Sequence, residues 1–265
     1  LFGNKPRNPE KEKLTQFHMD IASSIQEVTE DIMLRITNSL ASEYDIKNLC
    51  LAGGVALNCV ANGKILRNGK FKNIWIQPAA GDAGGSLGAA LGLWHIELKK
   101  NRITNAKDGM KGSYLGPEYS QNEVEKKLKE IGANFEILGD EQLFEKVALE
   151  LSNGKTIGWF QGRMEFGPRA LGNRSILGDA RSENMQKILN LKVKFRESFR
   201  PFAPSIIRED LSTWFNLNCD SPYMLLVSSV VNDKRRVMTE KEKALFGIDK
   251  LNVKRSDIPA VTHVD

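Results

Sequence analysis

The spacing of apolar residues predicts alternating helices and strands in the first hundred positions. Residues 10–42 place apolar side chains every three or four positions, which is the period of one face of an amphipathic helix. That stripe consists of Ile21, Ile25, Val28, Ile32, Ile36 and Leu40. Apolar runs over 48–52 and 73–77 predict buried strands, each followed by glycines and then by a helix, over about 56–67 and 86–99. Strand, glycine turn and helix, repeated twice, indicate an α/β fold with both turns at one end of its sheet.

The periodicity stops over residues 100–117, where Lys, Asn, Gly and Asp dominate. We place a domain boundary there, which divides the chain into units 1–105 and 106–265. A capping-box sequence, Ser-Gln-Asn-Glu, starts a helix over 120–132, and a second helix is predicted over 141–153. The second unit therefore begins with two helices.

The remainder of the second unit is predicted to mix strands and helices. Apolar runs predict strands over 135–138, 156–160 and 223–231. A helix is expected over 183–193. The strand over 156–160 leads directly into a loop with three glycines and one proline, which extends to residue 175.

Composition places the chain among globular proteins of aqueous compartments. It is 41% hydrophobic and 27% charged, and no apolar run approaches the roughly 20 residues that a membrane helix needs. The three cysteines, Cys50, Cys59 and Cys219, are odd in number and lack metal-ligand spacing, so we expect a reduced, cytoplasmic setting. Since the chain starts at Leu1 rather than at a methionine, we also expect a piece of a longer protein.

Positive charge is concentrated in residues 163–200. This window holds nine Lys and Arg against four acids, so it carries the whole net charge of +5. Cations on a backbone punctuated by Gly and Pro suit a phosphate-bearing small molecule better than nucleic acid, because the charge is not spread along a helix or tail. The alternative is a set of salt bridges with Glu165, Asp179 and Glu197, which is the favoured interpretation for Arg181 and for two lysines. Those lysines are Lys187 and Lys192.

Lys194 and Arg200 cannot share one face of a continuous helix, because they would lie about 600° apart around its axis. Either the helix breaks between them, or they reach a ligand from different elements. Three phenylalanines alternate with these cations, which suggests a partly desolvated site anchored by aromatic rings. They are Phe195, Phe199 and Phe202.

The two glycine turns are candidates for ligand contact. After the first strand, Gly53 and Gly54 allow the backbone to approach a ligand, and Asn58 stands one helical turn further on. After the second strand, Asp82 lies between glycines, where it is either a ligand of a hard cation or a helix N-cap. The alternative for the first turn is a tight strand-to-helix connection without a ligand.

With these motifs in hand, the chain resembles the O-carbamoyltransferases of the nodulation-protein and antibiotic-biosynthesis type, in particular their C-terminal part. The segments that carry the resemblance are 51–58, 78–90, 167–176 and 194–204. The resemblance implies the C-terminal half of an actin/sugar-kinase-like (ASKHA) domain, similar to the tRNA threonylcarbamoyl-transfer enzymes. It implies a partial YrdC-like α+β domain after it.

The resemblance also implies a reaction. The second domain would form carbamoyl-adenylate from carbamoyl phosphate and ATP, and the first would pass the carbamoyl group to a hydroxyl near an iron-type or Mg cation. Carried over by position, Gly53, Gly54 and Asn58 contact the nucleotide, and Asp82 binds the metal. The cations implied to bind carbamoyl phosphate and ATP are Arg163, Arg169, Lys194 and Arg200, the last three as catalytic groups.

Two departures from the family pattern matter. Two histidines that complete the family's metal site have no counterpart here, and further family segments lie downstream, so we expect this fragment to be inactive alone. Two other functions stay open. One is a sugar-kinase-like phosphotransferase, which would act without carbamoyl phosphate. The other is an RNA-binding module that uses the 163–200 window, whose affinity would fall steeply with salt.

Overall fold

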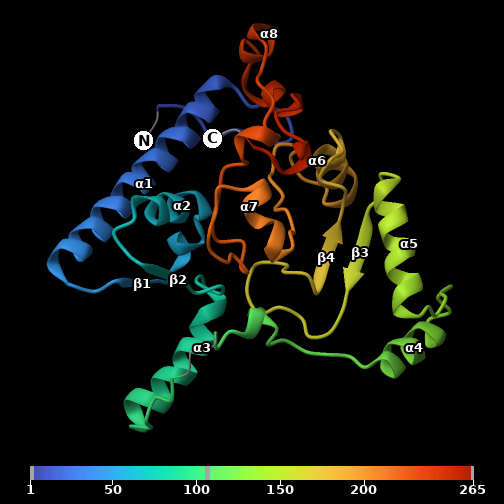
Figure 1. Ribbon diagram of the computed structural model, residues 1–265, viewed down its shortest axis with the longest axis horizontal. Coiled ribbons are helices and arrows are strands. Elements are labelled where there is room, and N and C mark those ends of the chain that lie inside the picture. The colour runs from blue at the N-terminus through green and yellow to red at the C-terminus, as the bar shows by residue number, and fades with distance from the viewer. Residues whose placement is uncertain (1–2, 105–107, 264–265) are drawn as a thin grey trace.

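The computed structural model of the protein describes residues 3–104 and 108–263, and it has two small sheets with helices around them (Figure 1). In the first region helices and strands alternate, which confirms the predicted α/β order. Its elements are α1 (Gln16–Glu43), β1 (Asn48–Leu51), α2 (Cys59–Asn68), β2 (Asn73–Ile76) and α3 (Ala83–Gly92). β1 and β2 are parallel neighbours, with Leu51 opposite Ile76.

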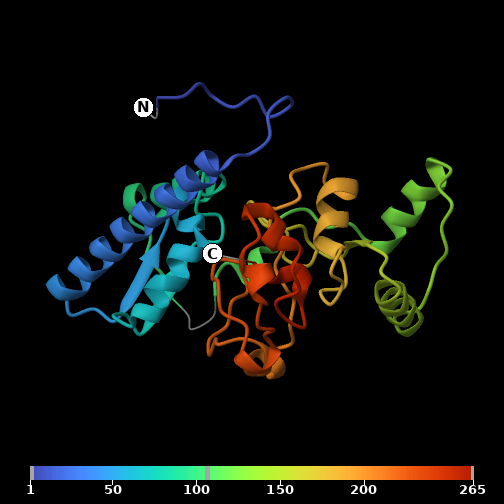
Figure 2. The ribbon, with the colours of Figure 1, turned by 90° about the horizontal axis from the view of Figure 1, so that it is seen from above.

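The second region is built around an antiparallel hairpin. β3 pairs with β4 so that Ile157 lies opposite Leu177 and Phe160 opposite Arg174, and the connecting loop spans residues 161–173. The elements of this region are α4 (Gln121–Glu130), α5 (Asp140–Ser152), β3 (Ile157–Phe160), β4 (Arg174–Leu177), α6 (Met185–Ile188), α7 (Leu211–Trp214) and α8 (Glu240–Lys243). In Figure 2, α4 and α5 stand on the far side of this hairpin from α1 and α2.

Most helices form where the apolar spacing predicts them, but α1 starts later. The chain was expected to be helical from Glu10, whereas the amides of Lys11 and Glu12 both donate to the carbonyl of Asn8 and close a separate turn. Thr15 then caps the helix. The predicted helix over 183–193 is present as α6 and a wider, π-helical continuation from Leu189 to Val193.

The apolar stripe of α1 faces solvent in this structure. Ile25 is 61% exposed and Ile36 55% exposed, and Val28, Ile32 and Leu40 are exposed as well. The opposite face of α1 packs against the rest of the protein. There Met33, Leu34 and Ala41 lie against a small core of Leu49, Ile65 and Phe71, and the polar side chains Glu30 and Thr37 are buried.

Two predicted strands are wrong. Residues 135–138 form no regular element and pair with no strand among the residues that the structure describes. Over 223–231 there is a single bridge, between Val230 and Phe215. The burial expected for that segment is nevertheless observed at Tyr223, Leu225 and Val230. Its apolar side chains enter the core from an irregular backbone.

One hydrophobic core joins the two predicted units. Its buried members come from both sides of the predicted boundary: Ala56, Ile76, Ala80, Met110, Tyr223 and Leu225. The fully buried Asn62 adds a polar link, because its Nδ2 donates to the carbonyls of Ala56 (2.8 Å) and Leu225 (3.0 Å). The boundary placed at 105/106 lies outside the described residues. Within the described ranges, the structure contains no helix with the length and apolarity needed to cross a membrane.

Candidate functional site

The two glycine turns lie side by side at the carboxyl ends of β1 and β2, as predicted. The amide of Gly53 donates to the carbonyl of Ala80 over 2.9 Å, which joins one turn to the other. Gly53 has a φ of 95°, a conformation that other residues rarely adopt. Apart from the adjoining residues of the turn itself, no heavy atom of the described chain lies within 4 Å of where a Cβ would stand on Gly53 or Gly54. The backbone of the first turn is therefore open on one side.

The 161–173 loop reaches across from the hairpin and contacts both turns. Gly167 lies against the second turn, since a Cβ there would stand 3.3 Å from the carbonyl oxygen of Pro78. Arg169 Nη2 donates to the carbonyl of Leu57 in the first turn over 3.3 Å. Phe166 and Leu171 of the same loop pack on the shared core. The basic loop and both turns thus form one surface, although they are far apart in sequence.

The conformation of this loop is held by one buried carboxylate, Glu165. Its Oε1 accepts hydrogen bonds from the backbone amides of Leu171 (2.7 Å), Asn173 (2.8 Å) and Arg174 (3.2 Å). Its Oε2 accepts from Arg174 Nε over 2.8 Å. Burial alone would raise the pKa of Glu165, but these donors outweigh it and lower the pKa to about 2. Glu165 is therefore ionised at neutral pH.

Sequence reasoning named Glu165 only as a salt-bridge partner, and its pairing with Arg174 confirms that part. Its larger role was missed: Glu165 accepts hydrogen bonds from backbone amides within residues 171–174 and so fixes the loop there. A signal was present, because Glu165 is the only acid between Gly162 and Ser175.

Arg169 is a cation of the 163–200 window that contacts the first glycine turn. It is half-buried, and it makes no ion pair with any described residue. Its Nε is buried without a hydrogen-bond partner in the described chain. A buried donor without a partner costs free energy comparable to a lost hydrogen bond. An anion that accepts from this Nε would remove that cost.

The other predicted phosphate-binding cations are more exposed and are not brought beside Arg169 by any observed contact. Arg163 donates to the carbonyl of Gly116 (3.1 Å) and lies 3.4 Å from the Glu118 carboxylate. Arg200 pairs with Glu197 at 3.0 Å. Lys194 ends the helical segment, so the helix does break between Lys194 and Arg200 as one alternative required.

Lys194 and Arg200 follow α6, which lies at the opposite end of β4 from the 161–173 loop (Figure 1). The expected aromatic anchoring is also wrong in part. Phe195 is 84% exposed, whereas Phe202 lies under the Arg196 guanidinium at 5.0 Å. Arg181 pairs with Asp179 at 2.7 Å, as favoured.

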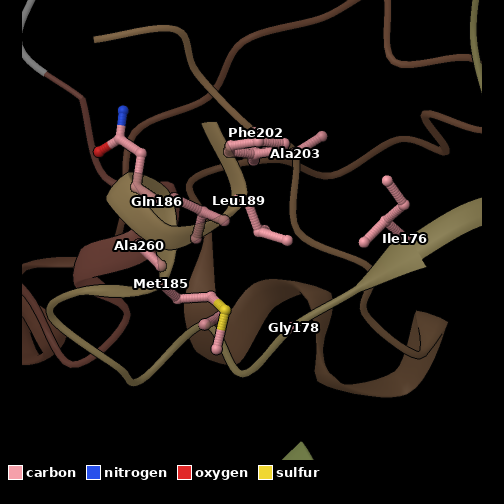
Figure 3. A pocket seen from close by; sticks show the side chains of 10 residues that line it. Ile176, Gly178, Met185, Gln186, Leu189, Phe202, Ala203 and Ala260 are labelled. Carbon is pink, nitrogen blue, oxygen red and sulfur yellow. The ribbon is translucent and has the colours of Figure 1, made fainter. Parts of the chain in front are cut away.

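A small pocket lies between β4, α6 and the segment after Arg200 (Figure 3). Its walls are largely apolar, formed by side chains such as Ile176, Met185, Leu189 and Phe202. Gln186 stands at the edge, and its Nε2 donates to the carbonyl of Arg200 over 3.1 Å. Since no charged side chain lines it, this pocket does not suit a phosphate.

The two remaining predicted residues have different surroundings. Asn58 caps α2, because its Oδ1 accepts from the amide of Ala61 over 3.1 Å, and it also pairs with Gln26 on α1. Asp82 precedes α3 and is exposed, and its carboxylate does not cap the helix. Among the described residues there is no group of three or more His, Cys, Asp and Glu that could hold a metal ion. Asp82 is therefore not part of such a group.

The structure places two glycine turns and a basic loop on one surface of a mixed α/β protein. Comparison with known sequences is more specific. The family description "Carbamoyltransferase N-terminus" matches residues 1–91, and "Carbamoyltransferase C-terminus" matches residues 148–265. The chain belongs to the carbamoyltransferase family. Because both descriptions match, its resemblance is not confined to the C-terminal part of the family.

Individual relatives agree with this assignment. An uncharacterized Synechocystis protein is 57% identical over 267 residues, which cover 100% of this chain and 43% of that protein. Nodulation protein NolO of Bradyrhizobium diazoefficiens is 41% identical over 84% of this chain and 41% of its own length. The 3'-hydroxymethylcephem-O-carbamoyltransferase of Streptomyces clavuligerus is 31% identical over 82% of this chain and 35% of its own length. The chain thus spans less than half the length of these relatives.

Proposed function

We propose that this chain is part of an ATP-dependent O-carbamoyltransferase. Carbamoyl phosphate, ATP and one water would give carbamoyl-adenylate, pyrophosphate and phosphate. The hydroxyl oxygen of a small-molecule acceptor would then attack the carbamoyl carbon, so that AMP leaves and the hydroxyl proton is lost. The observation that carries the proposal is the 161–173 loop, which contacts both glycine turns. It places against the first turn a half-buried arginine, Arg169, that has no acidic partner among the described residues.

The physical role of this arrangement is to hold anions together. Carbamoyl phosphate and ATP repel each other, and cations fixed in a partly desolvated site reduce that repulsion and stabilise the leaving phosphate groups. Arg169 would bind carbamoyl phosphate or ATP through its unpartnered Nε. The open backbone at Gly53 and Gly54 would accept the nucleotide, and Arg163, which lies on the same loop as Arg169, would extend the cationic surface. Lys194 and Arg200 lie at the other end of β4 and are not part of this surface. We route no step through a metal ion, because the described residues contain no group of three or more His, Cys, Asp and Glu that could hold one.

Isotope exchange tests the adenylation step. The full-length protein, of which this chain is a part, is incubated with ATP, carbamoyl phosphate and labelled pyrophosphate. The proposal is supported if label appears in ATP only when carbamoyl phosphate is present. It is refuted if no label appears in ATP in the presence of carbamoyl phosphate. Phosphoryl transfer without carbamoyl phosphate would instead favour a sugar-kinase-like enzyme.

An arginine variant ties the activity to the loop. Arg169→Lys keeps the charge but loses the fork of donors, and we expect exchange to fall about 10- to 100-fold, the effect of one hydrogen bond to a charged group. Arg181→Lys is the matched control, because Arg181 is exposed and pairs with Asp179 away from the turns. Equal losses in the two variants would contradict the assignment of Arg169.

A further inference from the structure

A chain of polar side chains links α1 to the first glycine turn. Gln26 Nε2 donates to Glu30 Oε1 over 2.7 Å and to Asn58 Oδ1 over 3.1 Å. In return, Asn58 Nδ2 donates to Gln26 Oε1 over 2.9 Å. Glu30 is only 5% exposed, and its other oxygen pairs with the ammonium group of Lys64 on α2. The face of α1 that packs inward is therefore polar where it meets Asn58.

At both ends of this series of hydrogen bonds, the direction of donation is fixed. At one end, the amide of Ala61 donates to Asn58 Oδ1, and a backbone N–H cannot accept. At the other end, Glu30 only accepts when it is ionised. Burial raises the pKa of Glu30, but the hydrogen bonds from Lys64 and Gln26 outweigh burial and hold it below its usual value. The two amides between these ends consequently have one orientation each.

The orientation leaves Asn58 with little free hydrogen-bonding capacity. A side-chain amide has two acceptor positions and two N–H donors. Both acceptor positions of Asn58 are used, by Ala61 and Gln26, and one donor is used by Gln26. Both donors of Gln26 are used as well. What remains on Asn58 is one N–H.

We propose that Gln26, held by the Glu30–Lys64 ion pair, is a positioning residue that leaves Asn58 a single N–H to offer, so that the turn selects a hydrogen-bond acceptor on the nucleotide. The inference rests on the proposed function, because it takes the 53–58 turn as the nucleotide contact. The acceptor is a ring nitrogen of the base or an oxygen of the ribose. A donor such as an exocyclic amine does not fit this position.

The test measures ATP affinity of the chain and of two variants on the same helix. Gln26→Leu removes the hydrogen bonds that Gln26 makes with Asn58 and Glu30. We expect the Kd for ATP to rise about 3- to 10-fold, the effect of one misdirected hydrogen bond. Gln16→Leu is the matched control, because Gln16 also donates to an acid four residues on, Asp20, but at an exposed site. The control should bind ATP as the unchanged chain does. Thermal unfolding shows that each variant is folded.

A set of analogues separates positioning from a merely structural role. Each analogue lacks one acceptor: 1-deaza-, 3-deaza- and 7-deaza-ATP lack a ring nitrogen, and 2'-deoxy- and 3'-deoxy-ATP lack a ribose oxygen. In the unchanged chain, one of them should bind about 10-fold more weakly than ATP, which identifies the acceptor. In Gln26→Leu that difference should shrink, because Asn58 no longer presents its N–H in one direction. General loosening would weaken all ligands alike and leave their ratios unchanged.

The outcomes are distinct. Equal ATP-to-analogue ratios in the unchanged chain and in Gln26→Leu would overturn the inference while leaving nucleotide binding intact. A chain that binds no ATP at all would overturn both the inference and the proposed function. If Gln26→Leu does not fold, Gln26→Met replaces it. If neither folds, the analogue series decides, and five analogues that all bind like ATP would show that no such acceptor is selected.

Discussion

The Glu165 carboxylate should control the stability of the 161–173 loop in a pH-dependent way. The informative change is Glu165→Gln, which keeps the size of the side chain and one oxygen acceptor but removes the charge. Glu165 is 5% exposed and bonded to the Arg174 side chain and to three backbone amides. Removing its charge weakens all of these bonds at once.

The magnitude follows from the pKa of Glu165, which falls from 4.5 to about 2. Each unit corresponds to roughly 1.4 kcal/mol, so the ionised carboxylate contributes about 3 kcal/mol. Because the folded state lowers this pKa, the contribution is fully present above the pKa of about 4.5 in the unfolded chain. It is lost progressively as the pH falls toward 2.

Urea unfolding of the unchanged chain and of Glu165→Gln, at several pH values between 7 and 2.5, measures this contribution. We expect the variant to be less stable by about 2 to 3 kcal/mol at pH 7, and the difference to shrink below pH 4.5. Glu123→Gln is the control, because Glu123 is exposed and caps α4 without an ion pair. A difference between Glu165→Gln and the unchanged chain that stays constant down to pH 2.5 would refute the reasoning.

Three further predictions concern the packing around the turns. Asn62→Ala removes two bonds from a fully buried amide and should cost about 1 to 3 kcal/mol in urea unfolding, whereas a smaller cost would mean that the bonds are dispensable. Gly84→Ala should destabilise the chain by at least about 2 kcal/mol, since its Cβ would stand 2.1 Å from the carbonyl oxygen of Ala79; unchanged stability would contradict this close approach. The Tyr223 hydroxyl donates to Asp108, and burial together with that hydrogen bond raises the pKa of Tyr223 to about 12. Stability should therefore fall between pH 10 and 12, a fall that Tyr223→Phe abolishes in alkaline unfolding curves.

The sequence was sufficient for the elements whose signal is local. The glycine turns after β1 and β2, the capping box of α4 and the helix beginning near residue 185 each follow from a few neighbouring residues. The run over 223–231 failed as a strand because apolar burial alone does not provide a pairing partner. There, the carbonyl of Leu225 is bonded by the side chain of Asn62 instead.

The side of α1 that packs could not be predicted from the apolar period. The stripe through Ile25 and Ile36 predicts a helix, but the side that packs depends on what the neighbouring elements offer. In this structure α2 offers Lys64 and Asn58, and these bind Glu30 and Gln26 on the polar side. Likewise, the contact of Arg169 with Leu57 spans 112 residues, and no local pattern predicts it.

The contrast between two half-buried arginines shows what the structure adds to the charge count. Among the described residues Arg196 has no acidic partner at hydrogen-bond distance, but its Nε donates to Asn190 Oδ1 over 2.7 Å and its guanidinium lies over Phe202. The chain itself therefore satisfies its Nε. Arg169 has only a 3.3 Å bond to the carbonyl of Leu57, and its buried Nε has no partner among the described residues. Since a buried guanidinium is stable only when its donors are matched, Arg169 is the one of the two whose environment is completed by an added anion. A count of positive charges ranks the two arginines alike, whereas their partners assign Arg196 to the fold and support the proposed ligand-binding role of Arg169.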